Sequence, residues 1–256
     1  TYYDFVDVDN DRYVINGEYR QVMLSPRELS YKNLTSRIWI NEHFTYTHGY
    51  GVAMGPVNRI SPEGLPEFFL QDIPPVSAID LKVTRPEIYY GEIPNDYVFV
   101  RTKAEEFDYP SGEKNVPATY RGRGGVTDLA FLRKVVFATY FGSLKILLSN
   151  DITPESRILY HRHIRDRVAK IAPYLKLDQD PYLVITKEGR LVWLVDGYTT
   201  SDRMPYAQPF GRLGNYIRNS VKAAVDAYDG SIELYVSDAK DPLIQAYQRI
   251  FPGVLK

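Results

Sequence analysis

Short apolar runs separated by turn-forming residues dominate the first half of the chain. The Asn16-Gly17 pair lies inside the apolar-rich segment 13–24, and this dipeptide is the strongest short-range indication of a β-hairpin with a type I′ turn. Five prolines between residues 56 and 75 exclude long helices there, because proline lacks a backbone donor and restricts the preceding residue. Further strands are expected at 87–90 and 97–102.

The second half begins with helical patterns. After the glycine-rich loop 122–125, Thr127 and Asp128 are suitable caps for an apolar helix over 126–148. That stretch is long enough to cross a bilayer, but four charged residues interrupt it, so we interpret it as an amphipathic or partly buried helix. We prefer core packing to membrane-surface docking for its apolar side. A second helix is predicted over 153–172, from the cap-like Thr153-Pro154-Glu155 sequence.

Antiparallel hairpins follow at 182–195 and 220–237, and Asp241-Pro242 begins a last helix that runs through Ile250. The pattern predicts an α+β fold, with a β-rich N-terminal half followed by helices packed on an antiparallel sheet of hairpins. We expect a β-rich, proline-punctuated part over 1–125 and a part of helix plus antiparallel hairpins over 126–256, or one continuous domain joined near 122–125.

The amino-acid composition excludes several classes of function. The 256 residues are 44% hydrophobic and carry a formal charge of -1, which is ordinary for a globular domain and provides no overall attraction for nucleic acid. The absence of cysteine excludes disulfides, thiolate metal sites and cysteine nucleophiles. The chain has 22 tyrosines. Because tyrosine combines an apolar ring with a polar hydroxyl, it suits strands with one solvent-exposed face, interfaces and carbohydrate-like surfaces. Because the chain begins at Thr1 without an apolar signal segment, we expect it to be part of a longer protein.

Several long strings resemble uncharacterised protein family zero-one-eight-two of the UPF series, a family of large multi-pass bacterial and cyanobacterial membrane proteins. The strings that carry the resemblance are Asn41–Gly51, Arg85–Glu92, Asp151–Leu159, Asp196–Arg203, Asn215–Val221 and Tyr228–Gly230.

The resemblance implies that transmembrane helices lie elsewhere in the parent protein and that this chain is part of its soluble region. It implies a location at the cell membrane, with this region outside the cytoplasm. The family has no assigned activity, so no functional residue is carried over from it.

Four acidic residues have the spacing of a calcium-binding loop. Asp7, Asp9, Asp11 and Glu18 occupy the first, third, fifth and twelfth places of a twelve-residue EF-hand loop. Against this interpretation, Arg12 stands where the loop needs glycine, and Asn16-Gly17 favours a hairpin. Calcium is therefore an alternative, and no other cofactor is expected.

Histidine chemistry gives a second alternative. His43 and His48 are five residues apart, a spacing that fits neither one helix face nor one strand face, so zinc binding by this pair is not expected. His48 could act as a general base in a hydrolase-like enzyme with Asp196 or Asp202. No G-x-S-x-G elbow accompanies these residues, and we favour a structural role for His48.

The absence of catalytic motifs and the tyrosine-rich strands favour a non-enzymatic binding, sensing or scaffolding module, and the resemblance implies that it is an extracytoplasmic part of a membrane protein. Its expected partners are the transmembrane region of the parent protein and another envelope protein or a cell-surface polymer. Nucleic acid is not among them.

Overall fold

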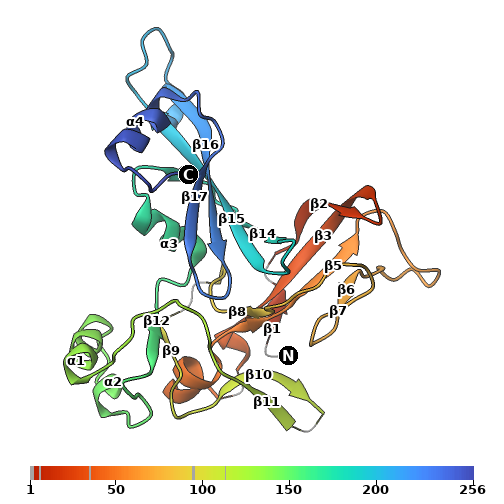
Figure 1. The fold of residues 1–256 in the computed structure, drawn as a ribbon, viewed down its shortest axis with the longest axis vertical. Coiled ribbons are helices and arrows are strands. Elements are labelled where there is room, and N and C mark those ends of the chain that lie inside the picture. The colour runs from red at the N-terminus through yellow and green to blue at the C-terminus, as the bar shows by residue number, and fades with distance from the viewer. Residues whose placement is uncertain (1–2, 6, 35, 94–95, 113) are drawn as a thin grey trace.

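The predicted Asn16-Gly17 hairpin is present at one side of the first sheet, which confirms the prediction. Asn16 and Gly17 both adopt positive φ, 53° and 81°, as a type I′ turn requires. The strands of this antiparallel sheet are β1 (Tyr3–Phe5), β2 (Asp9–Ile15), β3 (Glu18–Leu29), β5 (Val52–Pro56), β6 (Leu70–Gln71) and β7 (Val76–Ser77). Its order is β1-β3-β5-β6-β7, with β2 also paired to β3 (Figure 1). The computed structural model describes residues 3–5, 7–34, 36–93, 96–112 and 114–256.

The second large sheet contains the two hairpins predicted in the C-terminal half, and it confirms both. Its strands are β13 (Lys176–Leu177), β14 (Tyr182–Ile185), β15 (Leu191–Ser201), β16 (Tyr216–Asp226) and β17 (Ile232–Val236). Alternate residues of β15 are buried, including Trp193 and Val195, so one face of the sheet points into the core. Helices α3 (Ile164–Ile171) and α4 (Pro242–Ile250) pack on this core through Val168 and Ile244. The predicted α+β class is confirmed.

Three smaller antiparallel pairs and three short helical segments connect the sheets. The pairs are β4 (Gly49–Tyr50) with β8 (Glu87–Ile88), β9 (Val98–Val100) with β12 (Arg157–Leu159), and β10 (Glu106–Ser111) with β11 (Lys114–Ala118). The segments are the 3-10 helices η1 (Tyr31–Asn33) and η3 (Gly211–Leu213) and the π-helix η2 (Asn41–Thr45). Strands β8 and β9 lie within the predicted segments 87–90 and 97–102.

One hydrophobic core joins residues from both halves of the chain. Val22 and Val52 from the first sheet belong to the same buried cluster as Trp193 and Val221 from the second. Side chains also connect the two sheets. The Asp9 carboxylate and the Tyr13 hydroxyl accept hydrogen bonds from the backbone amides of β14, at 2.8 and 2.7 Å. The predicted division near residue 125 therefore falls between segments that share a core.

The long apolar helix predicted over 126–148 is two shorter helices. Val126 is extended, and its backbone exchanges two hydrogen bonds with Ile158. Asp128 has a φ of 55°, outside the right-handed helical region, so helix α1 (Phe131–Tyr140) begins later than predicted. Gly142 at φ 63° then ends this helix before α2 (Lys145–Leu148). Among the described residues, none of the helices has the length and apolar character needed to cross a membrane.

The helix predicted over 153–172 was wrong in its first half. Residues 157–159 form a strand that pairs with β9. Burial of the Ile158 and Leu159 side chains stabilises this strand by more than the weak helix propensity of the segment would stabilise a helix. The helix begins only at Ile164, where the His163 side chain accepts a hydrogen bond from the Asp166 amide. The intervening residues 160–163 form a connecting segment.

Candidate functional site

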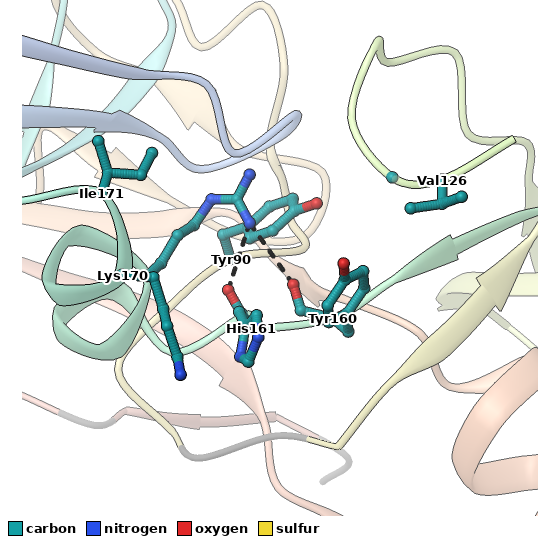
Figure 2. Close-up of a pocket in the computed structure, with 8 residues that line it drawn as sticks. Tyr90, Val126, Tyr160, His161, Lys170 and Ile171 are labelled. Carbon is teal, nitrogen blue, oxygen red and sulfur yellow. Dashed lines mark hydrogen bonds between the residues drawn. The ribbon is translucent and has the colours of Figure 1, made fainter. Parts of the chain in front are cut away.

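The connecting segment between β12 and α3 contains an uncommon backbone conformation. His161 has a φ of 50°, in the left-handed region that residues with a side chain rarely adopt. Such conformations persist only where the surrounding structure holds them, and they concentrate at functional sites. Tyr160 and His161 form the chain segment that crosses the centre of Figure 2.

The neighbouring Arg162 side chain holds this segment in place. It is 1% exposed, and its guanidinium donates hydrogen bonds to the carbonyls of Tyr89, Thr47 and Asp96 and to the Tyr31 hydroxyl. Burying a guanidinium costs free energy unless its N–H groups are hydrogen bonded, and here backbone carbonyls provide most of the acceptors. Arg162 therefore anchors the segment in the interior.

A hollow of about 300 Å³ lies on one side of this segment. Lys170 and Ile171 extend from helix α3 on one side of it, and Val126 lies opposite (Figure 2). Arg167 also lines the hollow. Its Nε donates to the Gly230 carbonyl at 2.7 Å, and its guanidinium lies 4.5 Å from the centre of the Tyr90 ring. These contacts fix a cation in the wall.

A second hollow of about 290 Å³ shares Tyr160 and His161 with the first. Tyr97, Tyr140 and Phe141 provide an aromatic side to it. Its polar lining residues are Asp96, Arg162, His163 and Asp166. The two hollows thus meet at Tyr160 and His161, and both have aromatic and polar walls.

The first hollow has a positive character. Arg167 and Lys170 line it, and no carboxylate is among its described lining residues. Burial and the nearby positive charges of Lys170 and Arg167 lower the pKa of His161, so its ring is neutral at pH 7 and can donate one hydrogen bond and accept another. This arrangement suits a ligand that combines a negative charge with a flat or ring-shaped apolar face.

His48, for which the sequence favours a structural role with general-base catalysis as the alternative, lies elsewhere, in a buried network. His48 is 1% exposed, and its Nε2 lies 3.1 Å from Asp108 Oδ1 while its Nδ1 lies 2.8 Å from Thr47 Oγ1. The two aspartates predicted as its partners contact other residues. Asp196 pairs with Lys222 and accepts a hydrogen bond from Asn219, and the exposed Asp202 lies near Arg203. Thr47 is buried like His48, so a substrate in solution could not reach either side chain. We therefore interpret this network as structural.

The structure does not bring together the four acidic residues predicted to form a calcium loop. The Asp9 carboxylate bonds the Leu183 amide across to β14, and Asp11 bonds the adjacent Arg12 amide. Glu18 lies beyond the hairpin turn, where it pairs with Arg20. Strands β2 and β3 leave this segment extended, whereas a calcium loop must curl around its ion.

Asp7 instead meets two acidic residues from distant parts of the chain. One carboxylate oxygen each from Asp7, Glu92 and Asp180 lies within 4.8 Å of the other two. Glu92 is placed here by Glu28, whose buried carboxylate accepts hydrogen bonds from the Glu92 and Ile93 amides at 2.7 and 3.1 Å. These three carboxylates are the described residues that could hold a metal ion.

The charges in this cluster oppose one another. Burial, followed by the negative charges of Glu28, Asp9, Asp7 and Asp180, raises the pKa of Glu92 to about 8. Burial also raises the pKa of Asp9 to about 6 and raises the pKa of Asp180. Glu92 Oε2 is buried and has no hydrogen-bond partner among the described residues. Either a proton or a cation would relieve this repulsion.

Comparison with known proteins identifies the family. The sequence model described as "Uncharacterised protein family (UPF0182)" matches residues 1–256. The chain belongs to this family. UPF0182 proteins of Geobacter sp. (strain M21) and Geobacter sulfurreducens are each 59% identical to it over 256 residues, which is 100% of this chain and 29% of each relative. A UPF0182 protein of Pelotomaculum thermopropionicum is 53% identical over 257 residues, covering 100% of the chain and 28% of the relative.

The chain therefore spans less than a third of the length of these UPF0182 relatives. No solved structure matches it. The predicted resemblance is confirmed, and the biochemical function of the family is uncharacterised.

Sequence reasoning missed both groups of residues that the UPF0182 fold brings together. Glu92 and Asp180 are far from Asp7 in sequence, so no spacing pattern could connect the three. Tyr160 and His161 were assigned to a helix, where they would have been surface residues. The available signal was the run Tyr160–His163, an aromatic and basic stretch directly after three residues of strand.

Proposed function

We propose that this region of the UPF0182 protein is a non-enzymatic binding module on the outer side of the cell membrane, in a multi-pass membrane protein. Its proposed ligand is an acidic saccharide of a cell-surface polymer, bound where the two hollows meet at Tyr160 and His161. The observation that carries the proposal is the pairing of two aromatic side chains, Tyr90 and Tyr160, with two cations, Arg167 and Lys170, in the wall of the first hollow.

The chemistry of such a ligand matches both parts of the wall. The apolar face of a sugar ring can lie against an aromatic side chain, whose hydroxyl or ring nitrogen remains available for hydrogen bonds. A uronate carboxylate can take charge-assisted hydrogen bonds from Lys170 and from the neutral ring of His161. The strained His161 backbone, held by the buried Arg162, would keep these groups in place before the ligand arrives.

The binding test uses an oligogalacturonate as the probe and isothermal titration calorimetry as the readout. We expect the chain to bind the probe, and we expect Lys170→Ala and Tyr160→Ala each to weaken binding about tenfold, the value of one charge-assisted contact or one aromatic face. Lys176→Ala is the matched control, because Lys176 is also exposed but lies on β13 and does not line the hollow.

A wild-type chain that does not bind the acidic probe would overturn the proposal. So would equal binding by the Lys170→Ala, Tyr160→Ala and Lys176→Ala variants. A neutral oligosaccharide that binds as well as the acidic one would remove the role assigned to Lys170.

A second candidate function is calcium binding by Asp7, Glu92 and Asp180. The observation that favours it is the buried, unpaired Glu92 Oε2 within a group of mutually repelling carboxylates. Calcium prefers such oxygen ligands, and an ion here would connect the first sheet, the segment after β8 and the segment before β14. Its stabilising effect would follow the ion concentration by mass action.

Thermal unfolding in a calcium titration tests this candidate. We expect millimolar calcium to raise the Tm of the wild-type chain and to leave the Tm of Asp180→Asn unchanged. Asp202→Asn is the control, because Asp202 is exposed and outside the cluster, and it should respond as wild type does. An unchanged Tm for the wild-type chain would exclude a calcium site.

A further inference from the structure

The two helices α1 and α2 have an apolar side that the fold does not cover. Their inner side packs Phe137, Ala138 and Ile146 into a core with Phe44 and Phe99. We call the uncovered side the outer face. It consists of six large apolar residues: Phe131, Leu132, Val136, Tyr140, Leu144 and Leu148. Of these, Tyr140 also lines the second hollow.

The exposure of the outer face is too high for side chains that merely border a core. Phe131, Leu132, Leu144 and Leu148 are between 72% and 78% exposed, and Val136 and Tyr140 are more than half exposed. Single exposed apolar residues are ordinary, but six of them on two successive short helices indicate an interaction site. The inner face already attaches the helices to the fold, so the outer face is not needed for folding.

The charged residues around the outer face indicate what kind of partner it binds. Between residues 128 and 150 the chain has three basic residues and one acidic residue, Asp128. Lys134 is held by the carbonyl groups of Ile152 and Ser149, at 2.7 and 3.4 Å. Arg133 and Lys145 are exposed next to the apolar side chains. Arg133 lies 3.8 Å from the Asp128 carboxylate, so the basic residues outnumber this single acidic residue. An apolar surface edged by cations is complementary to a layer of anionic headgroups over an apolar interior.

We propose that the outer face of α1 and α2 docks on the surface of an anionic lipid bilayer. The Phe131, Leu132, Leu144 and Leu148 side chains would enter the boundary between headgroups and acyl chains, and Arg133 and Lys145 would contact lipid phosphates. The two helices lie at a corner of the molecule, away from both large sheets, where a flat surface can approach them (Figure 1). A second copy of the chain fits less well, because it would bring the same cations face to face.

Vesicle co-sedimentation of the chain tests the proposal. The probes are vesicles of phosphatidylcholine alone and vesicles in which roughly a third of the lipid is phosphatidylglycerol. We expect binding to the anionic vesicles, an about tenfold loss in Leu132→Ser/Leu148→Ser, and a loss in Arg133→Gln/Lys145→Gln that is confined to anionic vesicles. Ile60→Ser/Leu65→Ser is the matched control, because both residues are exposed and apolar but lie in the first half, between β5 and β6.

Several outcomes would overturn the proposal. One is a wild-type chain that stays in the supernatant with both kinds of vesicle. Another is an equal loss in the Ile60→Ser/Leu65→Ser control. A third is a dimer in light scattering that Leu132→Ser/Leu148→Ser abolishes, without vesicle binding by wild type, which would assign the face to a second copy. Circular dichroism melting confirms that each variant is folded, and unchanged oligogalacturonate binding by Leu132→Ser/Leu148→Ser separates this test from that of the saccharide site.

Discussion

At the residue scale, the abundant tyrosines serve largely as core residues with a polar end. Tyr89, Tyr120 and Tyr228 contact one another with ring centres 4.8 to 5.5 Å apart. The Tyr89 hydroxyl donates to Glu106 at 2.8 Å, as does Thr47 at 2.9 Å, and the Tyr120 amide donates to the other oxygen at 3.2 Å. Each ring contributes buried apolar area, and the hydroxyls of Tyr89 and Tyr228 are hydrogen bonded, whereas the buried Tyr120 hydroxyl has no hydrogen-bond partner among the described residues. Glu106 is therefore the common acceptor of a buried network.

Replacing Glu106 by alanine should destabilise the chain strongly. The change leaves the buried donors of Thr47, Tyr89 and Tyr120 without an acceptor, and breaking a buried charged network costs about 3–5 kcal/mol. Urea denaturation followed by circular dichroism measures the loss. Glu105→Ala is the control, because Glu105 is exposed, and it should change stability by less than about 0.5 kcal/mol. Similar losses in both variants would show that Glu106 does not organise the network.

The carboxylate cluster should make stability fall as the pH rises. The pKa of Glu92 is raised from 4.5 to about 8 in the folded chain, so folding favours the protonated form, and this contribution is full below pH 4.5 and lost by pH 8. Because Glu92 is partly exposed, we expect a loss on the order of 1 kcal/mol, or roughly 2–4 °C in Tm, between pH 5 and pH 8 without divalent cations.

Glu92→Gln should flatten this part of the pH profile, because glutamine does not titrate. Asp9, whose pKa is raised to about 6, contributes a smaller decline that is complete at lower pH and should persist in the variant. A Tm that rises from pH 5 to pH 8 in wild type would contradict the arrangement of charges described for this cluster.

At the scale of elements, local turn chemistry decided which predictions succeeded. Asn16-Gly17, the turn around Gly189 and the turn at Tyr228–Gly230 each join neighbouring strands, so their sequences alone predict the hairpins. Asp241-Pro242 likewise predicts helix α4, which Asp241 caps through the Leu243 amide.

Apart from the local break at Gly142, which divides the helix predicted over 126–148, the failures involve contacts between distant segments. Strand β12 forms because β9, more than fifty residues earlier, offers it an edge and a core. The hollows at Tyr160 and His161 arise from that change, and the Asp7, Glu92 and Asp180 cluster arises from three separate segments. Periodicity and spacing report only on neighbours in sequence, so neither site was predictable from them.

Asp241 extends its capping role into the second sheet, and its loss should affect both elements. Its buried carboxylate accepts hydrogen bonds from Thr199 and Ser220 and from the Tyr216 hydroxyl at 2.6 Å, in addition to the Leu243 amide. Asp241→Ala should therefore cost about 2–4 kcal/mol, beyond the value of a helix cap alone. Asp238→Ala removes a solvent-accessible pair with Arg218 and an exposed hydrogen bond from the Lys240 amide, and it should cost less than about 1 kcal/mol. Equal unfolding midpoints in urea would contradict this assignment.

At the scale of the whole molecule, the two predicted parts share their interior. Strand β9 from the first part pairs with β12 from the second, and one buried cluster contains Val22 and Val98 together with Leu159 and Trp193. Division at residue 125 would expose apolar surface on both sides of the cut.

A fragment of residues 1–125 should not fold by itself. We expect its NMR amide spectrum to have little dispersion, because half of its core is missing, and we expect dispersion to return when residues 126–256 are added as a separate chain. The fragment 126–256 alone serves as the second measurement. Cooperative unfolding of the isolated fragment 1–125 would instead support two domains.

Arg162 makes the completion of the interior a late step in the folding of this region during its synthesis. Its guanidinium bonds carbonyl groups of Thr47, Tyr89 and Asp96, all of which leave the ribosome well before it does. Until residue 162 emerges, those acceptors lack their donor. Burial raises the pKa of Glu28, and before then Glu28 also lacks the nearby positive charge of Arg162 that opposes this shift. The first half of the region is thus synthesised before its interior is complete. Its buried carbonyl groups receive their hydrogen bonds only when Arg162, from the second half, packs between them.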